Sequence, residues 1–177
     1  QPTLADYLRN YYDKRNAVAE SYAYGTQKAK NTNLKQFAET IRFLEEQDVR
    51  TPEQLTEKIQ EFDTQLNEVS QRLKKQLAAL QRVNVNLYAM KEYFETRPVY
   101  LELKNKYFGR EKFKEEHKKE LSGYYRSERI LKENLDENGK IPEGKWKREA
   151  DCLSEEIAAL RKEDKRIHAM LRKYEKV

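Results

Sequence analysis

The sequence predicts an all-α protein: an elongated helical domain built on a long antiparallel coiled-coil hairpin, with shorter flanking helices. The 177 residues include Gly 5 and Pro 4, which are too few for the many turns of an all-β fold. Charged residues make up 38% and hydrophobic residues 37%, and the mean hydropathy is -1.11, so a thick globular core is excluded. Two long stretches repeat apolar residues in steps of three and four, which is typical of long helices with one apolar stripe.

Residues 1–50 are expected to form two amphipathic helices. The first covers about residues 4–24, ends near Gly25 and is followed by a polar link over residues 25–28. The second helix carries its apolar face at three- and four-residue spacing, on Leu34, Phe37, Ile41 and Leu44.

Residues 51–177 are expected to form the hairpin, in one structural unit with the N-terminal helices. Its long helices cover about 52–95 and 143–176. The run Thr51-Pro52-Glu53-Gln54 marks the start of the first, because it combines an N-cap hydroxyl, a proline at the first helical position and a glutamine three residues after the cap. Its stripe consists of Leu55, Ile59, Phe62, Leu66, Val69, Leu73, Gln76, Leu80, Val83, Leu87, Met90 and Phe94. The matching stripe consists of Trp146, Ala150, Leu153, Ile157, Leu160, Asp164, Ile167, Leu171 and Tyr174.

A helical insert over residues 97–137 is expected between the two long helices. Because proline is tolerated in the first turn of a helix, Arg97-Pro98 predicts the start of a short helix that Gly109 closes. A second helix covers residues 110–135, and the run from Asn138 to Pro142 predicts the next turn.

The sequence contains none of the residue patterns that indicate an enzyme. Five scattered glycines form no phosphate-binding loop, and His117 and His168 stand apart from each other without metal-ligand spacing. We therefore expect no catalytic residue, no metal and no cofactor. We interpret His117 as a core-edge histidine, with a phosphate contact or a proton-sensitive joint as the alternatives, and Cys152 as a packing residue.

The sequence also indicates where in the cell the protein is expected to lie. It has no apolar run of membrane-spanning length, no signal-peptide pattern and one cysteine, so we expect a cytoplasmic protein without membrane insertion. Because the first residue is Gln1 rather than Met, we expect a piece of a longer protein or a processed form.

Positive charge is concentrated between residues 104 and 119, which we call the basic segment, where seven Lys or Arg stand against three Glu. Aromatic residues are interleaved with these cations, a combination that suits contact with a phosphate backbone and stacking on bases. The candidate DNA-binding residues are Lys104, Lys106, Arg110, Lys112, Lys114, Lys118, Lys119, Arg126 and Arg129. A run over residues 45–68 is acidic instead, and a solvated surface remains the alternative for both runs.

Several stretches resemble, in order, the region after the nuclease domain in relaxase/mobilisation proteins of plasmids and integrative conjugative elements of the Firmicutes type. They are Tyr11 to Ala17, Asn33 to Thr40, Phe43-Leu44, Thr51 to Leu55, Arg97-Pro98-Val99-Tyr100, Lys112-Phe113, Glu116-His117, Glu120, Tyr124-Tyr125 and Gly139 to Pro142. The residues of this resemblance that we expect to maintain the fold are Arg97, Pro98, Tyr100, Phe113, His117 and Tyr124.

The resemblance implies a role in conjugation. The family's nuclease nicks DNA at the origin of transfer with a tyrosine nucleophile and a metal held by histidines, and this chain lacks that domain, so no catalytic residue is carried over. What it implies here is a non-catalytic accessory domain that contacts DNA, relaxosome proteins or the coupling protein. The alternative is a protein–protein interaction or dimerisation coiled coil without DNA binding, with a homodimer formed through the heptad positions; Asp164 at such a position favours it.

Overall fold

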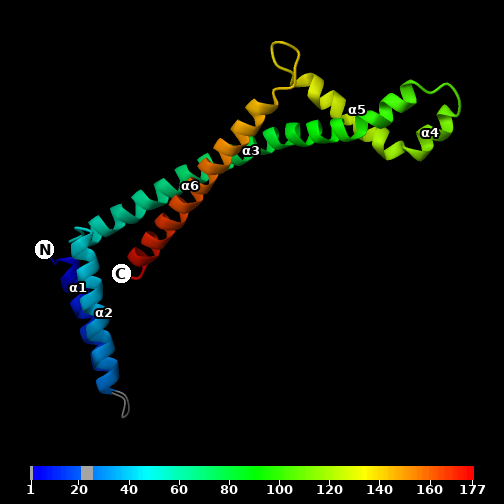
Figure 1. The fold of residues 1–177 in the computed structure, drawn as a ribbon. Helices are drawn as coiled ribbons and strands as arrows, with labels where there is room; N and C mark the ends of the chain where they lie inside the picture. Colours follow the sequence, from blue (N-terminus) through cyan, green and yellow to red (C-terminus); the bar gives the residue numbers. More distant parts are fainter. Residues whose placement is uncertain (1, 21–25) are drawn as a thin grey trace. The chain divides into compact units, whose positions relative to one another are not determined.

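The computed structural model describes residues 2–20 and 26–177, and in these residues every regular element is a helix (Figure 1). The prediction of an all-α fold is therefore confirmed. The helices are α1 (Leu4–Glu20), α2 (Thr26–Glu46), α3 (Pro52–Lys104), α4 (Arg110–Glu116), α5 (Lys118–Glu133) and α6 (Glu143–Glu175). The predicted end of the first helix near Gly25 lies outside the described residues.

The chain forms two compact units. The first combines Gln1–Glu68 with Asp164–Val177, and the second is Val69–Glu163. This division differs from a boundary at residue 50, because the beginning of α3 and the end of α6 pack with the N-terminal helices.

In the first unit, α1 and α2 lie side by side (Figure 1). The core of this unit contains Leu4, Leu8, Leu44, Val49 and Tyr174. The hydroxyl of Tyr174 donates a hydrogen bond to Oε1 of Gln47 at 3.1 Å. The polar link predicted over residues 25–28 is wrong from Thr26 onward, because α2 begins there; no glycine or proline after Gly25 prevents a helical turn.

The start of α3 is confirmed at Pro52, and its capping interactions are those of a capping box. The amide of Gln54 donates to the hydroxyl of Thr51 at 3.2 Å, and Oε1 of Gln54 accepts from the amides of Arg50 at 2.7 Å and Thr51 at 3.3 Å. Amide donors that the helix itself leaves unpaired are thus satisfied by side chains.

The apolar stripe of α3 is its sheltered face. All of the predicted stripe positions from Leu55 to Met90 are buried or half-buried, whereas Phe94 is 51% exposed. Near this point the partner of α3 within the second unit includes α5, so Tyr93 takes the inward position and stacks on Tyr124 with ring centroids 5.4 Å apart. A change of packing partner therefore moves the buried face by one residue.

The prediction that a new helix begins at Arg97-Pro98 is wrong, because α3 continues through Pro98 to Lys104. Proline has no N–H for the carbonyl of Phe94, and its ring crowds the preceding turn, so the helix interior is destabilised at this point. Packing offsets that cost, since Leu103 lies in an apolar cluster together with Phe113.

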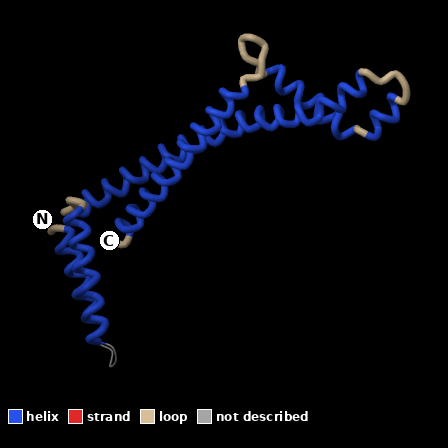
Figure 2. Tube along the Cα trace, in the orientation of Figure 1, coloured by secondary structure: helices blue, strands red, loops and turns tan. Residues whose placement is uncertain are grey.

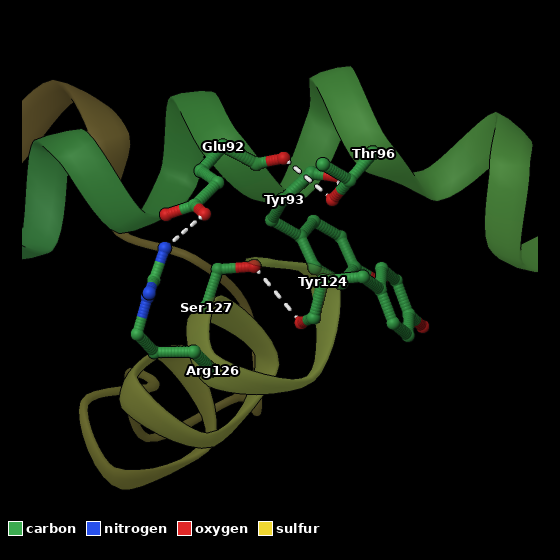
Figure 3. A network of polar contacts seen from close by, with 6 residues as sticks. All are labelled: Glu92, Tyr93, Thr96, Tyr124, Arg126 and Ser127. Atoms are coloured by element: carbon green, nitrogen blue, oxygen red, sulfur yellow. Dashed lines mark hydrogen bonds and ion pairs between the residues drawn. The ribbon is translucent and has the colours of Figure 1, made fainter. Parts of the chain in front are cut away.

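At the contact between α3 and α5, Gly123 lies beside the side chain of Glu92. A Cβ atom at Gly123 would collide with the carboxylate of Glu92, which extends across α5 to form an ion pair with Arg126 (Figure 3). In the same contact, the ring of Tyr124 stacks on Tyr100 with centroids 4.2 Å apart. The hydroxyl of Ser127, which is fully buried, donates to the carbonyl of Tyr124 at 2.9 Å (Figure 3).

The single helix predicted over residues 110–135 is two helices, α4 and α5, separated at His117. The backbone of His117 (φ -114°, ψ 29°) is not helical, although its N–H donates to Phe113 and its carbonyl accepts from Leu121. The break lets the short α4 bring Phe113, and α5 bring Leu121, into one cluster with Leu103. The turn predicted from Asn138 to Pro142 is confirmed as part of the loop between α5 and α6 (Figure 2).

Candidate nucleic-acid interface

The loop between α3 and α4, residues 105–109, is held by a network of internal hydrogen bonds. Nη1 of Arg110 donates to the carbonyl oxygens of Leu103 and Lys106, both at 2.9 Å. Gly109 reverses the chain with φ 66°, a left-handed conformation that glycine adopts without steric cost. These contacts give the loop a defined conformation.

Two aromatic side chains project from this loop into solvent. Tyr107 is 90% exposed and Phe108 is 89% exposed, the highest values among the large hydrophobic residues that the structure describes as exposed. The next aromatic residue, Phe113, is buried at 5% exposure. The loop therefore presents two neighbouring rings that make no contribution to the core.

Four of the candidate DNA-binding cations are exposed and have no carboxylate within 4.0 Å among the described residues: Lys104, Lys118, Lys119 and Arg129. Lys118 and Lys119 lie in the first turn of α5. Positive charge in that turn opposes the helix dipole, by about 0.3–1 kcal/mol for each charge at an exposed site. Glu120 in the same turn is negatively charged and therefore interacts favourably with the helix dipole.

The other candidates have partners within the chain. Lys112 and Lys114 form exposed ion pairs with Glu116 at 4.0 Å and Glu111 at 3.4 Å, and pairs of this kind contribute little to stability. Lys106 extends its ammonium group over the ring of Phe113, 4.8 Å from the centroid.

Arg110 and Arg126 have structural partners. The guanidinium group of Arg110 donates to the carbonyls of Leu103 in the last turn of α3 and of Lys106 in the loop, and that of Arg126 donates to the carboxylate of Glu92. Like Lys106, these two sequence-predicted site residues therefore interact with the fold itself.

The residues expected to maintain the fold lie around this segment. Phe113 and Tyr124 are buried, Tyr100 is half-buried, and Arg97 and Pro98 are exposed on α3. Burial raises the pKa of the Tyr124 phenol to about 12, with a contribution from Tyr93 beside it. The phenol is therefore neutral at physiological pH and stacks between two other tyrosine rings.

His117 lies at the junction of α4 and α5. Its ring packs against Phe113 with centroids 4.3 Å apart, and its Nδ1 lies 3.8 Å from the carboxylate of Glu120. Nδ1 is buried and has no hydrogen-bond partner. The contact with Phe113 agrees with a position at the edge of the core.

Other features limit the chemistry of the described residues. Within them, no group of three or more His, Cys, Asp or Glu side chains is placed to hold a metal ion. A helix with the length and apolar composition of a membrane span is also absent from these residues. Cys152 is exposed rather than packed, a correction to the expectation above, since Leu153 beside it points into the apolar cluster instead.

Sequence reasoning missed the difference in role between the aromatic residues. Tyr107, Phe108 and Phe113 stand equally among cations in the sequence, and exposure separates the first two from the third. A sequence signal for this difference exists: Tyr107 and Phe108 directly precede Gly109, a residue type that weakens a helix and often follows its end, whereas Phe113 has helical spacing with Leu121 and Tyr124.

The comparisons with known proteins identify no relative. The chain matches no protein-family model, no curated protein sequence and no solved structure.

Proposed function

We propose that this chain is a non-catalytic accessory domain of a conjugative mobilisation relaxase, which contacts DNA near the origin of transfer, relaxosome or coupling proteins, or both. The relaxase assignment rests on the order of the motifs described above. The DNA contact rests on one structural observation, the exposed cations of the basic segment and of α5 that lack partner carboxylates.

The position of these cations supports an external anionic partner. Lys118 and Lys119 oppose the dipole of α5 and have no compensating ion pair in the described part of the chain, so they do not stabilise the free fold. A phosphate group placed at this helix N-terminus would interact favourably with both lysines and with the dipole. Lysines in the first turn of a helix go against the charge preference of that turn, and residues that are unfavourable in this way without benefit to the fold are expected at functional sites.

We also propose that α3 and α6 pair as an antiparallel coiled-coil hairpin. Within the second unit, residues 72–76 of α3 share a surface depression with residues 156–160 of α6, and residues 79–86 share another with 149–153. From the first depression to the second, the residue numbers rise along α3 and fall along α6, as they do when two helices are antiparallel. The side chain of Gln76, at a stripe position, donates to the carboxylate of Glu156.

Charge reversal tests the DNA contact. The variant Lys104→Glu/Lys118→Glu/Lys119→Glu should lose most of its affinity for labelled duplex DNA in fluorescence anisotropy, because each cation that contacts a phosphate releases counterions. The matched control reverses Lys145, Lys147 and Lys162 on α6, which changes the net charge equally. Equal losses in both variants would indicate nonspecific attraction and contradict a localised interface.

A second candidate function is protein–protein interaction without DNA. The acidic run supports it, with eight Asp or Glu over residues 45–68 against Arg50 and Lys58. Asp164, at a stripe position, lies 3.3 Å from His168 one turn along the same helix. This candidate predicts that the charge-reversal variant keeps its partner and that the wild-type chain binds no duplex.

A further inference from the structure

We infer that the α3–α4 loop is a stacking platform for unpaired bases, so that the preferred ligand is single-stranded DNA. The inference rests on the DNA contact proposed above and adds the form of the nucleic acid. Phosphate contacts by lysines do not distinguish a single strand from a duplex, whereas stacking needs the face of a base to be free.

The two rings have no structural purpose in the described part of the chain. Tyr107 and Phe108 are 90% and 89% exposed, and neither ring lies in a buried apolar cluster or against another ring. Leaving two adjacent aromatic side chains in water forgoes the burial that stabilises such residues elsewhere. The loop therefore presents these rings to something outside the chain.

The loop is held in its conformation before any ligand arrives. Arg110 donates hydrogen bonds to the carbonyl of Lys106 in the loop and to that of Leu103 at the end of α3, and the ammonium group of Lys106 lies over the buried ring of Phe113. A platform whose backbone is already ordered loses less conformational entropy on binding than a mobile loop does. Arg110 is thus a positioning residue, not a phosphate contact.

The charges around the loop fit a nucleic-acid strand. Lys104 directly precedes the loop, and Lys112 and Lys114 follow it on α4, all three exposed. Cations that follow the backbone combined with aromatic rings that meet the bases are the usual composition of single-strand binding surfaces. An anionic membrane also attracts cations and aromatic rings, but α4 offers it no apolar face, because its Phe113 is turned inward.

Affinities for one sequence in two forms test the inference. The probe is an oligonucleotide of about 12 nucleotides with a central 2-aminopurine, used alone and annealed to its complement, and binding is followed by anisotropy at about 50 mM salt. We expect the full chain to bind the single strand more tightly than the duplex. The fluorescence of 2-aminopurine should change on binding the single strand, because stacking on an aromatic ring alters its emission.

Removing the rings should remove the preference. The variant Tyr107→Ala/Phe108→Ala should lose at least about fivefold in single-strand affinity for each ring that stacks, and should keep its duplex affinity and its salt dependence. The control Tyr88→Ala removes another exposed ring, 66% exposed on α3, and should change neither affinity. Both variants alter exposed side chains, so circular dichroism should show unchanged helix content.

The outcomes separate the two proposals. Equal affinity for both forms, or a double variant that keeps the preference, overturns the stacking platform and leaves the phosphate contact in place. No binding of either form overturns both proposals. Binding to vesicles of phosphatidylserine and phosphatidylcholine that needs both rings, with no change in 2-aminopurine emission, also overturns the platform and assigns the loop to a membrane surface.

Discussion

Phe113 holds the α3–α4 loop in place, and its removal should release α4 from α3. Phe113 is 5% exposed and shares a cluster with Leu103 and Leu121, while Lys106 and His117 lie against its ring. The change Phe113→Ala removes the buried ring and leaves a cavity, which costs about 3–5 kcal/mol in a packed core. A seven-residue helix has too few hydrogen bonds to persist without packing, so α4 should unfold locally.

Amide hydrogen exchange measures this effect directly. In Phe113→Ala, we expect the amides of residues 110–117 to exchange much faster than in wild type, while amides in the middle of α3 keep their protection. The matched control is Phe108→Ala, which removes the same ring from a site that is 89% exposed and should change stability by less than about 0.5 kcal/mol. Similar exchange in the two variants would refute the claim that the loop depends on a buried Phe113.

Three further predictions concern the fold. Pro98→Ala should stabilise the chain in urea unfolding by about 2 kcal/mol, because it restores an N–H for the carbonyl of Phe94, with part of the gain offset by a more flexible unfolded chain; a loss of stability would contradict an unfavourable proline. Thr51→Ala should cost about 1 kcal/mol in the same assay, because the Gln54 amide loses its cap; an unchanged unfolding midpoint would show that the capping box contributes nothing. The pKa of Tyr124 is about 12 in the folded chain against an ordinary value of 10.0, so between these pH values unfolding releases a proton. The free energy of unfolding should therefore fall as the pH rises from 10 to 12. Tyr124→Phe should lessen that fall, and an identical fall in the variant would contradict the raised pKa.

Local signals in the sequence predicted much of the fold. The run at Thr51-Pro52 carries its own capping groups, so the start of α3 could be read directly. The buried face of α3 also followed from residue spacing, because one narrow stripe is all that such a polar chain can bury.

The errors arose where tertiary packing outweighs a local rule. Proline usually begins or ends a helix, yet Pro98 lies inside α3, because residues after it pack on α4 and α5. His117 is not a helix-breaking residue, and the break there depends on the cluster that Phe113 and Leu121 share. Neither effect is visible without knowledge of which segments meet.

The candidate site was predictable in composition but not in role. The basic segment was evident from charge alone, whereas its division into paired and unpaired cations depends on side-chain distances. Arg110 illustrates this. In the sequence it is one cation of the basic segment, like Lys112, but in the structure its guanidinium group donates to two backbone carbonyls.

The most direct test of the account is the salt dependence of DNA affinity, measured by fluorescence anisotropy between about 50 and 200 mM salt. If Lys104, Lys118, Lys119 and Arg129 each neutralise one phosphate of a duplex, affinity should fall roughly 150-fold over this range. A fall of that order, reduced in the charge-reversal variant, is the predicted result. Absence of binding at the lower salt, or an affinity that does not change with salt, would contradict a DNA interface on the basic segment.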